Sequence, residues 1–285
     1  MAQYDHSDWN GSTGGTLGMQ RFLMKLFRFI PVSFAYAVMA FVIPFYMVFD
    51  RRGYKASYRF FRKRIGRSAV HSFLSVYANE FRLGQVVLDR FAFYAGKKYD
   101  FILDGQEHFD RLAVSQQGFI QLSSHVGNSE LAGYSFKSIH KPVRVLAYSG
   151  ESSIVMQQRA EMFSRTNMTL IPVAEDMSHI FALNAALLAG DIVTMPGDRL
   201  FGSSKSISCE FFGDSAKFPA GPFRLASQRD VPMLATFVMK EGVRRYRVYV
   251  RSLEGEDRAQ EYAGLLEETV RKYPTQWFNF YDFWK

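Results

Sequence analysis

A long apolar segment near the N-terminus places the strongest limit on how this chain can fold. No charged side chain occurs from Phe29 to Phe49, and a helix of that length would measure about 30 Å, close to the thickness of a bilayer's hydrocarbon core. Pro31 and Pro44 leave about a dozen residues of uninterrupted helix between them. The segment therefore predicts a membrane-spanning anchor or a helix that lies within one leaflet, with a buried core helix as the third possibility.

Basic residues gather directly after this segment. Eight lie from Arg51 to Arg67 with no acid among them, and they equal the whole net charge of +8. Such an excess of Lys and Arg predicts that the chain after the apolar segment stays in the cytoplasm. Tyr54, Tyr58 and Phe61 fall at helical spacing, which indicates a basic amphipathic helix beside anionic lipid head groups. Nucleic acid is the competing partner for this cluster, and we predict that it is not bound.

The remainder of the chain has the pattern of an α/β protein. Short apolar runs alternate with amphipathic stretches, which predicts a mostly parallel central sheet flanked by helices. We expect an N-terminal membrane-associated helical region over residues 1–67 and one α/β domain over residues 68–285. Strands are expected at residues 119–122, 143–147, 170–173, 192–196, 233–238 and 246–250. Helices are expected at residues 68–88 (with Phe73, Val76, Tyr77 and Phe81 inward), 129–136, 152–166, 178–189, 222–229 and 257–272.

The cysteine and histidine content disfavours both a disulfide and a metal site. The single cysteine, Cys209, excludes an internal disulfide and a multi-cysteine metal site. The histidines at positions 71, 108, 140 and 179 lack the spacing of metal ligands, so we predict no metal site.

The stretch from Ser123 to Glu130 is the strongest candidate for chemistry. His125 follows an apolar run that ends at Leu122, and four residues separate it from Glu130. A strand that ends at a histidine, followed by a turn and a helix that opens with an acid, can bring imidazole and carboxylate within hydrogen-bond reach. The carboxylate would fix the tautomer of the ring and raise its basicity, so the pair predicts a site that abstracts a proton.

Three further motifs follow in order. They are Gly197-Asp198-Arg199 after an apolar strand, Phe218-Pro219-Ala220-Gly221 before a helix, and Val231-Pro232-Met233 at the start of another strand. Together with the His-x4-acid motif, this order resembles that of the glycerolipid and lysophospholipid acyltransferase superfamily. The ending Pro274-Thr275-Gln276-Trp277 and the apolar N-terminal helix resemble its lipid A late-acyltransferase branch.

The resemblance implies a reaction in which an acyl chain moves from an acyl carrier protein or acyl-CoA thioester to a hydroxyl of a lipid acceptor. It implies that His125 is the general base, that Glu130 orients it, and that no further cofactor is needed. Arg199 matches an arginine that contacts an anionic head group, with an ion pair to Asp198 as the alternative. The substrate-binding set that we predict also contains Asn128, Gly197, Asp198, Phe218, Pro219 and Gly221.

The identity of the acceptor is less constrained. Ala220 stands where relatives carry glutamate, a departure shared with the lipid A branch, and it disfavours a glycerol-3-phosphate acceptor. A lipid A precursor at the inner (cytoplasmic) membrane is the leading expectation. The alternatives are an amino-acid lipid, an aryl-polyene or pigment lipid, or a membrane lipid-binding protein without catalysis. The absence of a Gly-x-Ser-x-Gly motif disfavours a serine hydrolase.

Overall fold

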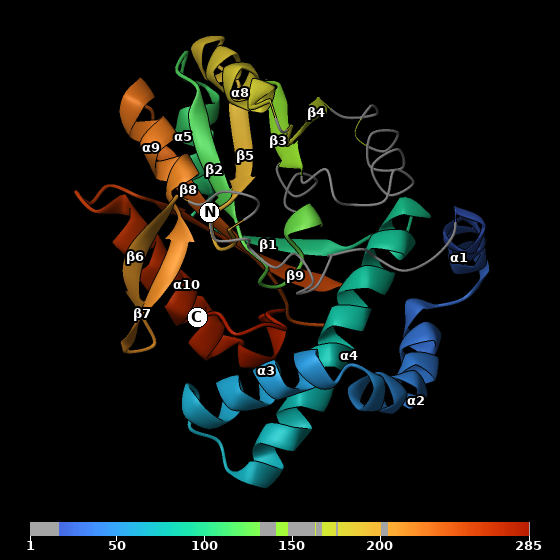
Figure 1. Ribbon diagram of the computed structural model, residues 1–285. Coiled ribbons are helices and arrows are strands. Elements are labelled where there is room, and N and C mark those ends of the chain that lie inside the picture. The colour runs from blue at the N-terminus through green and yellow to red at the C-terminus, as the bar shows by residue number, and fades with distance from the viewer. Residues whose placement is uncertain are drawn as a thin grey trace.

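The computed structural model describes residues 17–131, 141–147, 163, 167–174, 176–200 and 205–284. A seven-stranded sheet forms its centre, with the strand order β1-β9-β8-β2-β5-β3-β4 (Figure 1). Neighbouring strands are parallel except β8 and β9, which are antiparallel. The predicted α/β fold with a mostly parallel sheet is therefore confirmed. The strands are β1 (Asp100–Asp104), β2 (Phe119–Ser123), β3 (Val143–Ala147), β4 (Met168–Pro172), β5 (Ile192–Pro196), β8 (Met233–Lys240) and β9 (Arg245–Ser252).

Helices cover both faces of the sheet. Side chains alternate along β2, so that Ile120 and Leu122 enter the core beneath α8, α9 and α10, whereas Phe119 enters the core beneath α5 and the N-terminal helices. Both cores are lined by fully buried residues, because each face of a parallel sheet must be covered. The helices are α1 (Leu17–Phe29), α2 (Val32–Phe49), α3 (Arg51–Lys63), α4 (Ala69–Tyr94), α5 (Gln106–Ala113), α8 (Ser178–Leu188), α9 (Ala220–Arg229) and α10 (Arg258–Lys272), with 3-10 turns η1 (Ser129–Leu131) and η2 (Pro274–Gln276).

Several predicted bounds agree with the structure. The strands expected at 143–147 and 192–196 coincide with β3 and β5, and the helix expected at 257–272 is α10, whose N-cap Asp257 accepts from the Gln260 amide at 3.0 Å. The helix expected at 222–229 begins two residues earlier, at Ala220, and Pro222 lies in its first turn, where a missing N–H costs nothing. Most of each helix expected at 152–166 and 129–136 lies outside the described residues.

Elements that the sequence analysis did not predict are β1, α5 and a separate hairpin. The hairpin consists of β6 (Ser206–Phe211) and β7 (Asp214–Pro219), paired antiparallel. Its two connecting residues, Phe212 and Gly213, both have positive φ, at 54° and 77°, which is the geometry that matches the twist of a two-residue hairpin. The hairpin carries the Phe-Pro-Ala-Gly motif to the start of α9.

The helices α1 to α4 lie together at one side of the molecule, with α2 packed along α4 (Figure 1). Tyr36, Ile43 and Met47 face inward from α2 and are buried. The opposite row of α2 is exposed and entirely apolar: Phe34, Val38, Phe41, Phe45 and Phe49. The prediction that Phe73 of α4 faces inward is wrong, because Phe73 is exposed with Val70 and Leu74 on one face of the first turns of α4.

Candidate active site

The carboxyl ends of β2 and β5 bring His125 and Asp198 together. These two strands are parallel neighbours, and their register pairs Ser123 with Pro196. His125 and Asp198 each follow their strand by two residues, so both side chains reach the same edge of the sheet. Carboxyl ends of parallel strands are the usual place for ligand sites in open α/β sheets.

The imidazole of His125 is held by the carboxylate of Asp198. Its Nδ1 lies 2.8 Å from Asp198 Oδ1, and the backbone N–H of His125 donates to Asp198 Oδ2 at 2.7 Å. The side chain of Asp198 is 1% exposed, whereas that of His125 is 30% exposed. Burial acts to raise the pKa of Asp198, but the charge and hydrogen bonds of His125 outweigh it and leave that pKa below its ordinary value. In this pair the carboxylate is therefore shielded from solvent, whereas the imidazole ring is partly accessible.

Glu130 is held by helix α4. Its carboxylate accepts from Arg90 Nη1 at 2.6 Å and from the hydroxyl of Tyr94, and its side chain is 11% exposed. The carboxylate on Nδ1 of His125 is that of Asp198, which lies 73 residues away in the sequence. The structure thus places Asp198 on Nδ1 of His125, and Arg90 and Tyr94 on the carboxylate of Glu130.

The segment that carries His125 is braced by the C-terminal tail. Gly127 donates its N–H to the Gln276 carbonyl at 2.8 Å, and Phe278 donates to the His125 carbonyl at 2.9 Å. Gly127 has φ +63°, and a Cβ there would lie 2.0 Å from the Val238 carbonyl oxygen, so only glycine fits this approach. On the tail, Trp277 is buried among aromatic rings that include Phe60 and Phe211. The Pro-x-Gln-Trp ending thereby supports the backbone of the histidine.

Asn128 is a buried residue that connects this segment to the protein interior. Its amide Nδ2 donates to the Val86 carbonyl and to the Tyr246 hydroxyl, both at 3.4 Å, and its backbone N–H donates to Val238 at 2.8 Å. These contacts come from α4, β9 and β8.

Arg199 and Gly197 are also enclosed. Arg199 is 7% exposed, and its guanidinium donates through Nη2 to the Phe278 carbonyl. Burial lowers the pKa of Arg199, whereas the charges of Tyr281 and Asp198 act to raise it. Gly197 donates its N–H to the Ser123 carbonyl at 2.9 Å. A Cβ on Gly197 would lie 2.6 Å from the Tyr262 ring, so the chain passes this tyrosine too closely for any other residue.

The Phe-Pro-Ala-Gly motif lies where the hairpin enters α9. Phe218 is fully buried and contacts the rings of Phe211 and Phe283. Pro219 is buried at the N-cap of α9, whereas Gly221 is exposed in its first turn. Among the residues that the structure describes, no three His, Cys, Asp or Glu side chains gather as a metal site would require. Cys209 is buried, and burial raises the pKa of its thiol to about 11.

Comparison with known proteins gives these motifs a family. The model of the bacterial lipid A biosynthesis acyltransferase family matches residues 87–285, which is more than two thirds of the chain. This chain belongs to that family. It is an acyltransferase of lipid A biosynthesis, which implies an acyl donor and a lipid acceptor. The matched region begins within α4 and includes His125, Asp198 and the C-terminal tail. No curated protein sequence matches the chain significantly.

The acyltransferase site contains residues that sequence reasoning did not connect to the histidine. Arg90 and Tyr94, which hold Glu130, lie in a helix that was expected to end at residue 88 but continues to Tyr94. Their spacing of one helical turn was an available signal. Asn79 donates to the carbonyls of Thr275 and Trp277 at 3.0 and 2.9 Å. The available signal was a polar residue one helical turn after Val76, which was predicted to face inward.

Proposed function

We propose that this acyltransferase moves a fatty acyl chain from an acyl carrier protein or CoA thioester to a hydroxyl of a lipid A precursor, with His125 as general base. The observation that carries the proposal is the contact of His125 Nδ1 with Asp198 Oδ1 at 2.8 Å, with the carboxylate sealed and the ring accessible. With the Nδ1 proton held by Asp198, the lone pair of the ring is on Nε2. In this proposal Nε2 is the nitrogen that receives the proton.

In the proposed step, the acceptor O–H gives its proton to Nε2 of His125 as the oxygen attacks the thioester carbonyl. The tetrahedral intermediate then expels the thiolate, which takes the proton back from the imidazolium. No covalent acyl-enzyme forms, and the ring returns to its starting state. Asp198 stabilises the transient imidazolium, a role for which its sealed position is suited.

The other predicted site residues receive separate roles. Glu130, held by Arg90 and Tyr94, positions η1 beside the ring. Its carboxylate lies on the α4 side of the segment, whereas Asp198 lies on the β5 side. Asn128 fixes the same segment from within. The histidine is thus proposed to work with one acid that orients it and one that positions its segment.

Arg199 and the residues near α9 are proposed to hold the backbone around the site, because most of them are buried and therefore have little contact with substrate. The guanidinium of Arg199 binds the Phe278 carbonyl and so ties the tail to the end of β5. Gly197 permits the close passage by Tyr262. Phe218 and Pro219 anchor the start of α9, and the exposed Gly221 offers its own backbone N–H in the first turn to an anionic group of the substrate.

The test is a paired measurement on the protein in detergent and on cells. Purified protein is supplied with acyl carrier thioester or acyl-CoA and a lipid A precursor, and transfer is followed by mass spectrometry. Replacing His125 with alanine is expected to lower kcat by about 10² to 10⁴, the usual worth of a general base. Undiminished turnover in the His125→Ala variant would contradict the assignment. Comparison of lipids from cells with and without the protein identifies the acceptor by its lost acyl chain.

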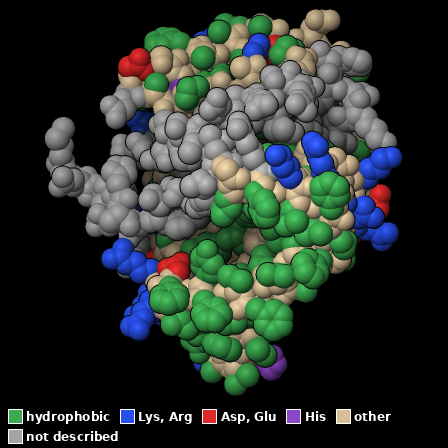
Figure 2. All heavy atoms as spheres, turned by 90° about the vertical axis from the view of Figure 1, so that its right-hand side faces the viewer, with side chains coloured by type: hydrophobic (Ala, Val, Ile, Leu, Met, Phe, Trp, Pro, Cys, Tyr) green, Lys and Arg blue, Asp and Glu red, His purple; other side chains and the backbone are tan. Residues whose placement is uncertain are grey.

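We also propose attachment to the cytoplasmic side of the inner membrane through α2. This helix is 18 residues long with a mean hydropathy of 2.0. Figure 2 shows hydrophobic side chains gathered over the side of the molecule to which α2 belongs, with basic side chains at the margins of the area. The exposed rows of α2 and of the first turns of α4 supply apolar residues, and α3 supplies exposed basic residues such as Lys55 and Lys63. Apolar surface flanked by cations is suited to an anionic leaflet.

The packing of α2 supports a position within one leaflet. Its inward row contacts α4, and Tyr36 donates to the buried carboxylate of Asp89. If α2 crossed the bilayer in this arrangement, α4 would carry Arg82, Asp89 and Arg90 into hydrocarbon, at a cost of several kcal/mol for each charge. Partition into phosphatidylglycerol-containing vesicles tests the surface. Lys63→Gln is expected to weaken partition about fivefold, for a loss of about 1 kcal/mol, and Lys217→Gln on the hairpin serves as the matched control.

A further inference from the structure

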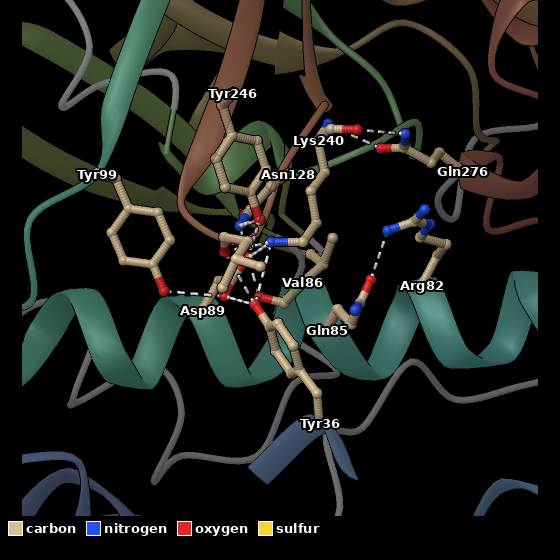
Figure 3. A network of polar contacts seen from close by, with 11 residues as sticks. Tyr36, Arg82, Gln85, Val86, Asp89, Tyr99, Asn128, Lys240, Tyr246 and Gln276 are labelled. Carbon is tan, nitrogen blue, oxygen red and sulfur yellow. Dashed lines mark hydrogen bonds and ion pairs between the residues drawn. The ribbon is translucent and has the colours of Figure 1, made fainter. Parts of the chain in front are cut away.

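A second ion pair lies inside the protein, on the opposite side of the histidine segment from Asp198. Lys240 Nζ lies 2.6 Å from Asp89 Oδ2, and the two side chains are 1% and 0% exposed. Three tyrosines complete what we call the Asp89 cluster: Tyr36, Tyr99 and Tyr246 (Figure 3). The members come from α2, α4, β8, β9 and the residue before β1.

Every acceptor site of the Asp89 carboxylate is used. Oδ1 accepts from the hydroxyls of Tyr36 and Tyr99, the latter at 2.8 Å, and Oδ2 accepts from Tyr246 and Lys240. Lys240 Nζ also donates to the Tyr36 hydroxyl at 3.0 Å and to the Val243 carbonyl at 2.8 Å. The cluster is a complete hydrogen-bonded network, which is the condition under which buried charges are tolerated.

Stability alone is a weak account of such a pair. Burial lowers the pKa of Lys240, and the Asp89 carboxylate acts in the opposite direction. Desolvation of two charges offsets much of their attraction, so an apolar set of similar volume would serve the fold as well or better. What an apolar set would lack is directionality. The hydrogen bonds of the cluster fix the position of α2 against the body in one register.

Two connections lead from the cluster to the segment that carries His125. The Tyr246 hydroxyl, which donates to Asp89, accepts from the amide of Asn128. The backbone N–H and carbonyl of Lys240 make two hydrogen bonds of 2.9 Å with the side-chain amide of Gln276. The backbone carbonyl of Gln276 in turn accepts from the N–H of Gly127 at 2.8 Å. Figure 3 shows Tyr36 on one side of the carboxylate and Tyr246 with Asn128 on the other.

We infer that the Asp89 cluster positions the His125–Glu130 segment according to how α2 is seated, so that Tyr36 is a positioning residue for catalysis. The membrane-facing helix and the histidine segment are both fastened to one carboxylate. Loosening α2 at Tyr36 releases one side of that carboxylate and shifts Tyr246 and Asn128 on the other. The part of this inference that concerns catalysis rests on the proposed function, whereas the mechanical connection does not.

Three single-hydroxyl variants test the connection. Tyr36→Phe removes the contact of α2 with the cluster. Tyr77→Phe removes a hydroxyl that also ties α2 to α4, by donating to the Ala40 carbonyl at 3.1 Å, but outside the cluster. Tyr99→Phe removes a hydrogen bond to the same oxygen of Asp89, but from a residue that lies outside α2. Each change deletes one oxygen atom, and thermal unfolding verifies that each variant is folded.

The first readout is hydrogen–deuterium exchange of the full chain in phosphatidylethanolamine–phosphatidylglycerol nanodiscs. Tyr36→Phe is expected to speed exchange in α2 and in the segment 125–131 together. Tyr77→Phe is expected to speed exchange in α2 alone. Unchanged exchange of 125–131 in Tyr36→Phe would overturn the inference, and so would equal effects of Tyr36→Phe and Tyr77→Phe on that segment. This readout needs no turnover, so it remains decisive if the proposed reaction fails.

The second readout is kinetic. Tyr36→Phe is expected to lower kcat about three- to tenfold with little change in KM, because small misplacement of a reacting group reduces rate more than binding. Tyr77→Phe and Tyr99→Phe are expected to stay within about twofold of the original kcat, because neither hydroxyl joins α2 to the Asp89 carboxylate and the reacting groups should keep their positions. Equal losses in Tyr36→Phe and Tyr99→Phe would show that the charge of Asp89 matters and the seating of α2 does not, which would also overturn the inference.

Discussion

The His125–Asp198 pair and the Lys240–Asp89 pair lie on opposite sides of one short segment. Both join a basic group to a carboxylate, at 2.8 and 2.6 Å. They differ in access: the His125 side chain is 30% exposed, whereas that of Lys240 is 1% exposed. In the proposed mechanism the accessible ring exchanges a proton with the substrate, whereas the ammonium of Lys240 is enclosed by tyrosines. The same kind of contact therefore suits chemistry at one place and positioning at the other, and exposure makes the difference.

Breaking the enclosed pair is expected to give the largest effect on stability. Lys240→Met leaves the Asp89 carboxylate buried without its cation, at a cost of about 3 to 5 kcal/mol in the free energy of unfolding. Asp89→Asn combined with Lys240→Met removes both charges and is expected to recover part of that loss. Urea unfolding in detergent measures both variants. An equal loss in the single and double variants would contradict the view that the uncompensated charge is the cause.

Breaking the accessible pair is expected to affect rate more than stability. Asp198→Asn keeps the size of the side chain but removes the charge that stabilises the imidazolium, so kcat should fall by about 10² to 10⁴. Because loss of a neighbouring anion lowers the pKa of a histidine, the acid limb of the pH–rate profile should move to lower pH.

Asp191 offers a matched control for that experiment. It is buried at the other end of β5 and pairs with Arg144 at 2.8 Å. Asp191→Asn is expected to leave kcat and the acid limb unchanged. If the two variants shifted the profile alike, the role given to Asp198 would be wrong.

Glu80 is a half-buried carboxylate that lies near another acid, Asp50, and it provides the prediction with the smallest expected effect on stability. Burial and the charge of Asp50 raise the pKa of Glu80 to about 7. An acid whose pKa is higher in the folded than in the unfolded state holds its proton longer when folded, so stability falls as pH rises from about 4.5 to 7. Glu80→Gln removes this penalty and is expected to be more stable at pH 8 by about 1 kcal/mol, after allowance for partial exposure.

Thermal unfolding as a function of pH provides the measurement. The stability of Glu80→Gln and that of the original chain should converge near pH 4, where Glu80 is protonated in both states. A constant difference across this range would show that the effect comes from packing and not from charge.

Local patterns in the sequence predicted much of the sheet and the helices. The runs at 143–147 and 192–196 are β3 and β5 because they are short, rich in aliphatic residues and bounded by breakers. The strands of the β6–β7 hairpin are not apolar runs: residues 206–211 alternate polar and apolar, which is a signal for a half-buried strand that was overlooked. The turn gave a weaker signal, because it uses a phenylalanine with positive φ. Phe73 was misplaced because helical periodicity says which residues share a face but not how far along the helix its neighbours extend: Val76 is buried, whereas Phe73 lies in the exposed first turns of α4.

The candidate site shows the same division. The His-x4-acid motif predicted His125 as the residue for chemistry, and the order of the motifs predicted the family that the comparison then confirmed. The motif also predicted Glu130 as the acid that orients the ring, because the two are close in sequence. In the structure, Nδ1 contacts Asp198, and Glu130 is bound by Arg90 and Tyr94.

The sequence by itself determined the fold class and the family, and it predicted His125 as the residue for chemistry, because periodicity, turn residues and motif order are properties of neighbouring positions. Only the tertiary structure decided that Asp198 is the carboxylate on Nδ1 of His125 and that Asp89 is the carboxylate paired with the buried Lys240. Those pairings depend on the register of β2 against β5 and on the packing of α4 against β8 and β9. Strand register and helix packing are set by burial summed over many distant residues, and no short stretch of the chain contains that information.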